Sequence, residues 1–158
     1  FVFNETGADA DGRIEWDTDS NLSFWDASTD RLGIGTATPA TKLDVNGAFR
    51  TTPVALTDGA TPALNAALSN TFTLAAAGNR TIAAPSNPVD GQKIIILHTA
   101  SAADRTLALT TGAGGFSFGT DITALTATTS GLTDAIGCIY NSTSNRWWVL
   151  AYVKGYNT

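Results

Sequence analysis

The sequence contains no methionine, one cysteine and one histidine, and these scarcities exclude several kinds of chemistry. A lone cysteine, Cys138, forms neither an intrachain disulfide nor a thiolate metal cluster. A lone histidine, His98, cannot build a multi-histidine metal site within one chain. Both lie in β-type apolar runs, so we expect both side chains to be buried in strands. The lack of methionine, at position 1 as elsewhere, is expected of a fragment or a processed product. From the scarcity of cysteine and histidine we also expect no cofactor.

Charge is also scarce: 15% of residues are charged, against roughly 25% in average soluble domains, while 43% are hydrophobic. Residues 1–50 hold nine acidic and four basic residues, whereas residues 51–158 hold five of each, so the net charge of −5 lies entirely in the first third. The absence of a basic stripe argues against nucleic acid as a partner. No apolar run approaches the ~20 residues of a membrane-spanning helix, so we expect no membrane insertion. A chain so poor in charge is expected to cover part of its surface with copies of itself.

Residues 1–50 alternate short apolar–polar segments (GRIEW, NLSFW, DRLGIG, KLDVNG) with turns rich in Asp, Ser and Asn. This pattern predicts strands of three to five residues in a thin β-hairpin stalk or attachment region. One hairpin is expected to turn at 26–30, with Leu22 and Phe24 on one arm and Leu32 and Ile34 on the other. Such a narrow ribbon is marginal alone, so something else must cover its apolar edge.

Residues 51–158 read as a separate antiparallel β-sandwich or jelly-roll-like head, because short strands and turns alternate without intervening helices. The segment 61–70, TPALNAALSN, is the one place where a short helix competes. The final strand is apolar on both faces, which indicates a central position or a covering subunit. By strict alternation, Trp147, Val149, Ala151 and Val153 share one face and Trp148, Leu150 and Tyr152 the other. Strands are predicted at about 53–57, 70–75, 80–84, 92–99, 105–110, 122–129, 134–141 and 146–154.

The stretch RLGIGTATPATKLDVNG, residues 31–47, raises the question of a phosphate-binding glycine loop. A dinucleotide fingerprint needs G-x-G-x-x-G ahead of a helix, but Thr38 occupies the third position and no helical pattern follows. The glycines are therefore conformational, at a bulge or a crowded threefold axis, with a corner and an Asn-Gly turn after them. The residues predicted to pack the stalk and set its path are Leu32, Gly33, Ile34, Gly35, Pro39, Leu43, Val45 and Gly47.

Candidate catalytic and ligand-binding groups are few. The pairs Asp9/Asp11 and Asp17/Asp19 lack the full calcium loop, so turn chemistry explains them and we expect no metal. The head's five acids fall mostly in predicted loops rather than across a sugar cleft, so we expect no enzyme. Aromatic rings stack on sugars, or pack in the core or at subunit interfaces; packing is favoured for Trp147 and Trp148, which lie inside a strand, and Tyr156 is expected to be the most exposed. These aromatic candidates are Trp147, Trp148, Tyr152 and Tyr156.

The string DASTDRLGIGTATPATKLDVNG, residues 26–47, resembles a segment of tailed-bacteriophage fibre and appendage proteins. Two further stretches, GNRTIAAPSNPVDGQKIIILHT and CIYNSTSNRWWVLAYVKG, resemble a β domain of phage minor structural proteins. The resemblance implies a homotrimeric virion structural protein with an intertwined stalk and a β-rich head. It implies assembly in the host cytoplasm, contacts with other virion proteins of tail or capsid, and a host-attachment role toward a surface polysaccharide.

Several functions remain open at this point. A trimeric fibre or spike component is the leading hypothesis, and a trimeric capsid decoration protein, with the acidic stalk as a clamp, is the alternative. A monomeric carbohydrate-binding module and a polysaccharide depolymerase are the other two hypotheses. Native mass separates the trimeric from the monomeric hypotheses, and release of reducing ends identifies a depolymerase.

Overall fold

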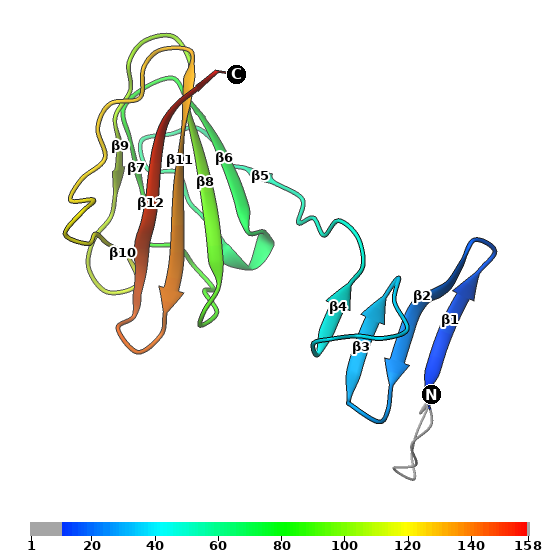
Figure 1. The fold of residues 1–158 in the computed structure, drawn as a ribbon. Helices are drawn as coiled ribbons and strands as arrows, with labels where there is room; N and C mark the ends of the chain where they lie inside the picture. The colour runs from blue at the N-terminus through cyan, green and yellow to red at the C-terminus, as the bar shows by residue number, and fades with distance from the viewer. Residues whose placement is uncertain (1–10, 158) are drawn as a thin grey trace. The chain divides into compact units, whose positions relative to one another are not determined.

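The computed structural model describes residues 11–157, and the chain divides into two compact units, residues 1–50 and 51–158 (Figure 1). Strands make up almost all of the regular structure, which confirms the all-β prediction. In the described range the sole helix is one 3-10 turn, Ala66–Leu68, within the segment where a helix was predicted to compete. The Asn65 side chain caps it by accepting a hydrogen bond from the Ala67 amide at 3.2 Å.

None of the helices among residues 11–157 is long and apolar enough to cross a membrane.

Unit 1 forms a single four-stranded sheet in the order β1-β2-β3-β4. The β2–β3 hairpin pairs Phe24 with Gly33 and Trp25 with Leu32, which confirms the predicted hairpin. β4 then returns parallel to β3, so the chain crosses over the sheet between them. The strands are β1 (Gly12–Trp16), β2 (Asp19–Asp26), β3 (Arg31–Ile34) and β4 (Leu43–Val45).

The crossover 35–42 covers one face of this sheet, as Figure 1 shows where the loop passes over β3. Pro39 is buried in it, and its carbonyl accepts a hydrogen bond from Arg31 Nη1 at 2.8 Å. On the same face, the Ala40 amide donates to Asp44 Oδ2 at 2.8 Å. Gly33 lies directly under the crossover: a Cβ there would collide with the carbonyl oxygen of Thr36.

Unit 2 contains a six-stranded sheet in the order β10-β12-β11-β8-β6-β5 and a two-stranded sheet of β7 and β9 (Figure 1). β11 and β12 form the predicted antiparallel hairpin, and β11 also pairs antiparallel with β8. The strands are β5 (Val54–Ala55), β6 (Thr71–Ala76), β7 (Arg80–Ile82), β8 (Lys93–Ala100), β9 (Leu107–Leu109), β10 (Phe116–Ser117), β11 (Leu132–Asn141) and β12 (Arg146–Asn157).

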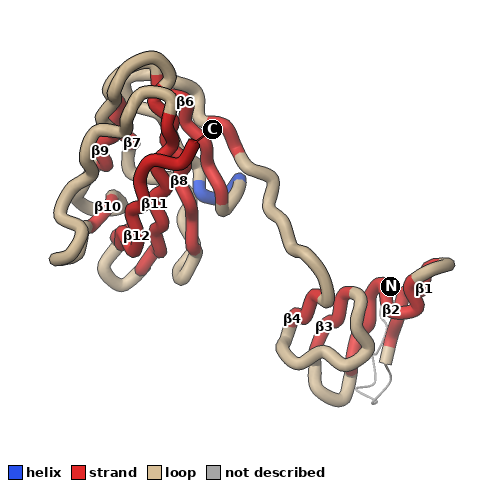
Figure 2. Tube along the Cα trace, turned by 45° about the horizontal axis from the view of Figure 1, so that its top comes forward, coloured by secondary structure: helices blue, strands red, loops and turns tan. Residues whose placement is uncertain are grey.

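The first part of unit 2 winds as a flat coil between two layers. β5, β6 and β8 lie parallel in the six-stranded sheet, while β7 and β9 lie parallel in the second layer, side by side in Figures 1 and 2. The segment ahead of β6 joins that second layer, because the Thr81 amide donates to Ala60 O and the Ser86 amide to Leu64 O. The chain therefore makes three windings, and the β11–β12 hairpin closes the sheet beyond the third.

Two sequence predictions for the head are wrong. A purely antiparallel sheet was expected because no helices separate the strands, yet β7 and its flanking loops provide a crossover long enough for β6 and β8 to run parallel. The predicted strand 122–129 is a loop with a single bridge, Arg105 to Thr128. Its threonines have strand propensity, but the loop is held mainly by side chains, described below.

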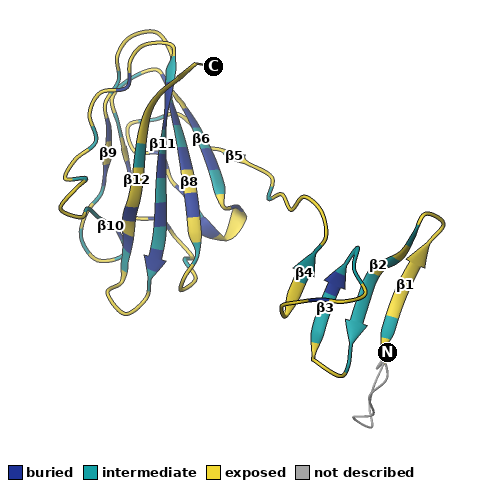
Figure 3. Cartoon of the chain, in the orientation of Figure 1, coloured by how far each residue is buried: buried dark blue, intermediate teal, exposed yellow. Residues whose placement is uncertain are grey.

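The core of unit 2 lies between the two layers, and Figure 3 shows the alternation of buried and outward-facing residues along β8 and β11. Phe72, Ile96 and Trp147 are fully buried. The Trp147 ring stacks at a tilt on Tyr140, with ring centroids 5.2 Å apart. The other core residues are Leu64, Ala66, Leu74, Ala76, Ile82, Ile94, Leu107, Leu109, Phe116, Ile136, Cys138 and Val149.

Two of the hairpins, β2–β3 and β11–β12, use five-residue turns of the same chemistry. In DASTD, Asp26 accepts from the Ser28 hydroxyl at 2.6 Å, and Asp30 takes a positive φ of 54°. In NSTSN, Asn141 Oδ1 accepts from the Ser144 amide at 2.7 Å, and Asn145 takes a φ of 51°. Asx side chains satisfy the turn's backbone and tolerate the left-handed conformation, so composition alone specifies both turns.

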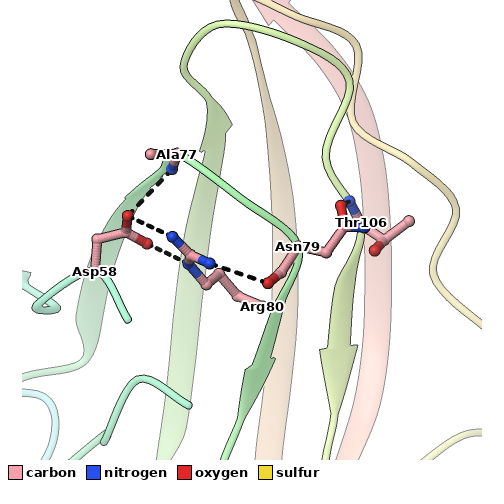
Figure 4. A network of polar contacts seen from close by, with 5 residues as sticks. All are labelled: Asp58, Ala77, Asn79, Arg80 and Thr106. Carbon is pink, nitrogen blue, oxygen red and sulfur yellow. Dashed lines mark hydrogen bonds and ion pairs between the residues drawn. The ribbon is translucent and has the colours of Figure 1, made fainter. Parts of the chain in front are cut away.

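A carboxylate–guanidinium pair ties the first winding to the second (Figure 4). Asp58 receives hydrogen bonds from Arg80 Nε and, at 2.8 Å, from Arg80 Nη2, and it also accepts from the Ala77 amide at 3.2 Å. Next to it, the Asn79 side chain accepts from the Thr106 amide at 3.0 Å, which reaches the third winding. The Arg80 hydrogen bonds lower the pKa of Asp58 to about 2.

Replacing Gly33 with alanine is expected to destabilise unit 1 by about 1–3 kcal/mol, because the new Cβ overlaps the Thr36 carbonyl and the crossover must shift. Hydrogen exchange of the β3 and β4 amides measures this loss locally. Gly59→Ala is the matched control, since nothing lies within 4 Å of its Cβ position. Equal protection in the two variants would contradict the crowding.

Replacing Asp58 with asparagine is expected to lower the melting temperature of unit 2 at neutral pH, because Arg80 loses its anionic partner. The folded pKa is depressed, so the contribution of Asp58 is complete above its ordinary value near 3.8 and is lost as pH falls toward 2. The difference in melting temperature between wild type and Asp58→Asn should therefore shrink between pH 4 and pH 2. A difference that stays constant across that range would count against the ion pair.

Candidate functional site

The uncovered face of the unit 1 sheet carries an apolar row. Strand pairing places Leu32 beside Leu43 and Ile34 beside Val45, so all four side chains share the face opposite the crossover. Leu43 is 57% exposed and the other three are half-buried. Ile14, 46% exposed, extends this face onto β1. Leu32, Ile34, Leu43 and Val45 are the four apolar residues that the sequence predicted to pack the stalk.

The predicted path-setting residues lie on the crossover side or at its ends. Gly33 and Pro39 are buried, and Gly35 adopts a φ of 70°, which favours glycine. Gly47 follows β4, where its amide donates to Val45 O at 3.0 Å. The sequence suggested that small residues let chains approach one another, but at Gly33 the close approach is to Thr36 of the same chain.

The outer face of the six-stranded sheet, the side away from β7 and β9, is also apolar. One row of paired residues runs Thr73, Leu97, Ala135 and Val153 across four strands. A second row of paired residues runs Lys93, Ile139 and Trp148 across three strands. A shallow hollow of about 570 Å³ lies on this face, between Thr73 and Tyr156.

A bulge in β12 changes which residues share this face. Gly137 pairs with Ala151 and Cys138 with Val149, so Leu150 is an extra residue between them. The strict alternation expected from the sequence is therefore wrong beyond Val149. Ala151 and Val153 lie on the outer face with Trp148, while Tyr152 turns inward to hydrogen-bond Asp134 at 2.9 Å.

The four aromatic candidates are not brought together. Trp147 is fully buried in the core, and Tyr152 is held by Asp134 and by the Thr126 carbonyl, to which it donates at 2.9 Å. Trp148 and Tyr156 are exposed, at 43% and 52%, and both border the outer face. Tyr156 borders the hollow together with Thr73 and Leu97, and Trp148 pairs with Ile139.

A buried polar network joins the loop before β11 to the sheet, and sequence reasoning missed it. His98, Thr128 and Asp134 are each at most 1% exposed. The Thr128 hydroxyl donates to Asp134 Oδ2 at 2.7 Å and lies 2.8 Å from His98 Nδ1. Asp134 Oδ1 accepts from the Gly155 amide at 2.9 Å. An acid at an inward position of an apolar strand was the available signal.

The network fixes the state of the histidine. Because the single hydroxyl proton of Thr128 goes to Asp134, His98 Nδ1 must carry a proton and donate to Thr128. Its Nε2 is then a bare, buried acceptor with no hydrogen-bond partner among the described residues. Burial lowers the pKa of His98, opposed by the charges of Asp134 and Asp58. Through these bonds Thr128 joins its loop to β8 and β11.

The remaining candidate groups have structural partners. Asp19 accepts from the Asn21 amide at 2.8 Å and Asp11 from the Ala27 amide at 2.9 Å, while Asp9 lies outside the described residues. Within residues 11–157 no group of three or more His, Cys, Asp or Glu side chains gathers in a metal-binding arrangement. Cys138 is buried as predicted, and burial raises the pKa of its thiol to about 12.

Comparison with family models, with curated proteins and with solved structures finds no match to this chain.

Acidification from pH 7.5 to 5.5 is expected to destabilise unit 2 through His98, the only histidine of the chain. The pKa of His98 in the folded state lies below its ordinary value of about 6.5, so the unfolded state binds the proton more readily. The free energy of unfolding therefore decreases as the pH is lowered. Thermal unfolding across this range measures the effect. His98→Asn is the matched variant, since its amide can replace the Nδ1–H donor but does not titrate. A wild-type pH dependence equal to that of His98→Asn would contradict the assignment.

Proposed function

We propose that this chain is a non-enzymatic structural protein of a tailed-bacteriophage virion, a homotrimeric fibre or spike component that presents a β-rich head for host attachment. The mechanism is assembly. A thin sheet that cannot bury its own apolar face gains stability when copies of the chain cover it, and the assembled stalk carries the heads outward.

The observation that carries the proposal is the uncovered apolar row of the unit 1 sheet. The crossover 35–42 protects one face, so Leu32, Ile34, Leu43 and Val45 have no covering layer within the described part of unit 1. A four-stranded sheet of short strands with one such face open buries too little to be stable in isolation. Covering that face with neighbouring copies removes the deficit.

The resemblance of residues 26–47 to fibre and appendage segments supports both the virion assignment and the number three. In unit 1 this string comprises the whole β2–β3 turn, β3, the crossover and β4. Its glycines and proline shape the crossover, and its aliphatic residues form the open face. Residues 26–47 therefore form a complete turn–strand–crossover–strand unit. Its aliphatic face is covered only when a partner binds.

Light scattering on the purified chain is expected to give a native mass three times 16.4 kDa, retained on dilution. Leu43→Asp should weaken the trimer, because an unpaired carboxylate would be buried on the covered face. Leu22→Asp is the control: this residue is 40% exposed and, by the alternation along β2, faces the other side of the same sheet. A monomer at high concentration would overturn the proposal and favour a carbohydrate-binding module.

A further inference from the structure

The outer face of the six-stranded sheet in unit 2 is the largest feature that the stalk does not account for. Five of its side chains are large, apolar and between 43% and 57% exposed. With half of each side chain open, the face offers roughly 500 Å² of apolar surface, at the upper end of what monomeric proteins leave exposed. These five residues are Ile95, Trp148, Leu150, Val153 and Tyr156.

We propose that this face is a second interface between copies of the chain, at which the heads of the assembly pack against one another. The inference rests on the proposed function, since it assumes an assembly of identical chains. It goes beyond that proposal by placing a contact in the head rather than in the stalk.

Charge favours a second copy as the occupant. Among the residues that strand pairing places on the face, only Lys93 and Arg146 are charged, and Nη1 of Arg146 is buried, so a charged partner would find little to pair with. Unit 2 itself has five acidic and five basic residues. Heads with no net charge approach without the repulsion that the acidic unit 1 would impose.

The face carries two different patches, which fits a head-to-tail arrangement of the heads. Trp148 and the bulge residue Leu150 stand at one side of it. The hollow of about 570 Å³, bounded by Thr73, Leu97 and Tyr156, lies at the other. A rotationally symmetric ring of three brings two different patches together at each contact, and this face holds two such patches, the exposed side chains of Trp148 and Leu150 and the hollow beside Tyr156.

The size of the face explains why the stalk is needed as well. A standard interface buries about 800 Å² on each partner, more than this face supplies. The head contact therefore adds to the stalk contact within the same assembly. Once one contact joins the copies, the other forms within the same assembly. Each contact therefore raises the effective concentration of the surfaces that form the other.

The test is the native mass of three variants of the full chain over a dilution series. Leu150→Asp and Val153→Asp place a carboxylate on the face at positions 57% and 47% exposed, where a single chain tolerates it. Each should shift the midpoint of dissociation to at least roughly tenfold higher concentration, because the carboxylate is buried without a partner in the assembly. Val89→Asp is the control, at a still more exposed position (67%) off the face.

Each outcome decides the proposal. A shift for both face variants and none for Val89→Asp supports it. A wild-type trimer that both face variants leave unchanged overturns the head interface while the stalk assembly stands. A wild-type monomer at high concentration overturns both, because no copies then meet.

Discussion

The packing of β7 and β9 against the inner face of the six-stranded sheet is the interaction on which unit 2 depends. Phe72, Ile96 and Trp147 are fully buried in this interface between layers. Each winding of the coil adds one segment to each layer, so the chain builds its core progressively along its length. The second layer is narrower than the first, and it covers one face only. The outer face of the six-stranded sheet therefore has no covering sheet within the described part of unit 2.

Unit 1 shows the same constraint at smaller scale. Its covering layer is a loop of eight residues rather than a second sheet, and the loop fits only because Gly33 lacks a side chain. Arg31 and Asp44 then bind the backbone of that loop from the strands below. In both units one face is covered from within the chain and the other is left apolar. These two apolar surfaces, in units with different amounts of charge, are the ones that we propose further copies of the chain to cover.

Local chemistry was predictable from the sequence, while long-range pairing was not. The two five-residue turns were readable because Asx residues at 26 and 141 act on their own backbone. The four aliphatic residues predicted to pack the stalk likewise fall on one face, because alternation in short strands leaves little freedom. The parallel order of β6 and β8 was missed, since it depends on β7 joining another layer. The bulge at Leu150 and the Thr128–Asp134 hydrogen bond depend on contacts between different segments of the chain. The periodicity within one segment carries no information about such contacts.

The coil has a consequence for how this fold changes length. One end of the six-stranded sheet is closed by the β11–β12 hairpin with β10, while the other ends in the two-residue strand β5. Inserting a whole winding beside β5 would lengthen each layer by one strand and leave the hairpin untouched. Because neighbouring windings contact mainly each other, such a change resembles adding a unit to a repeat protein more than remodelling a sandwich. Heads of different reach are thus accessible by duplication of about 20 residues, with the outer face extended in register.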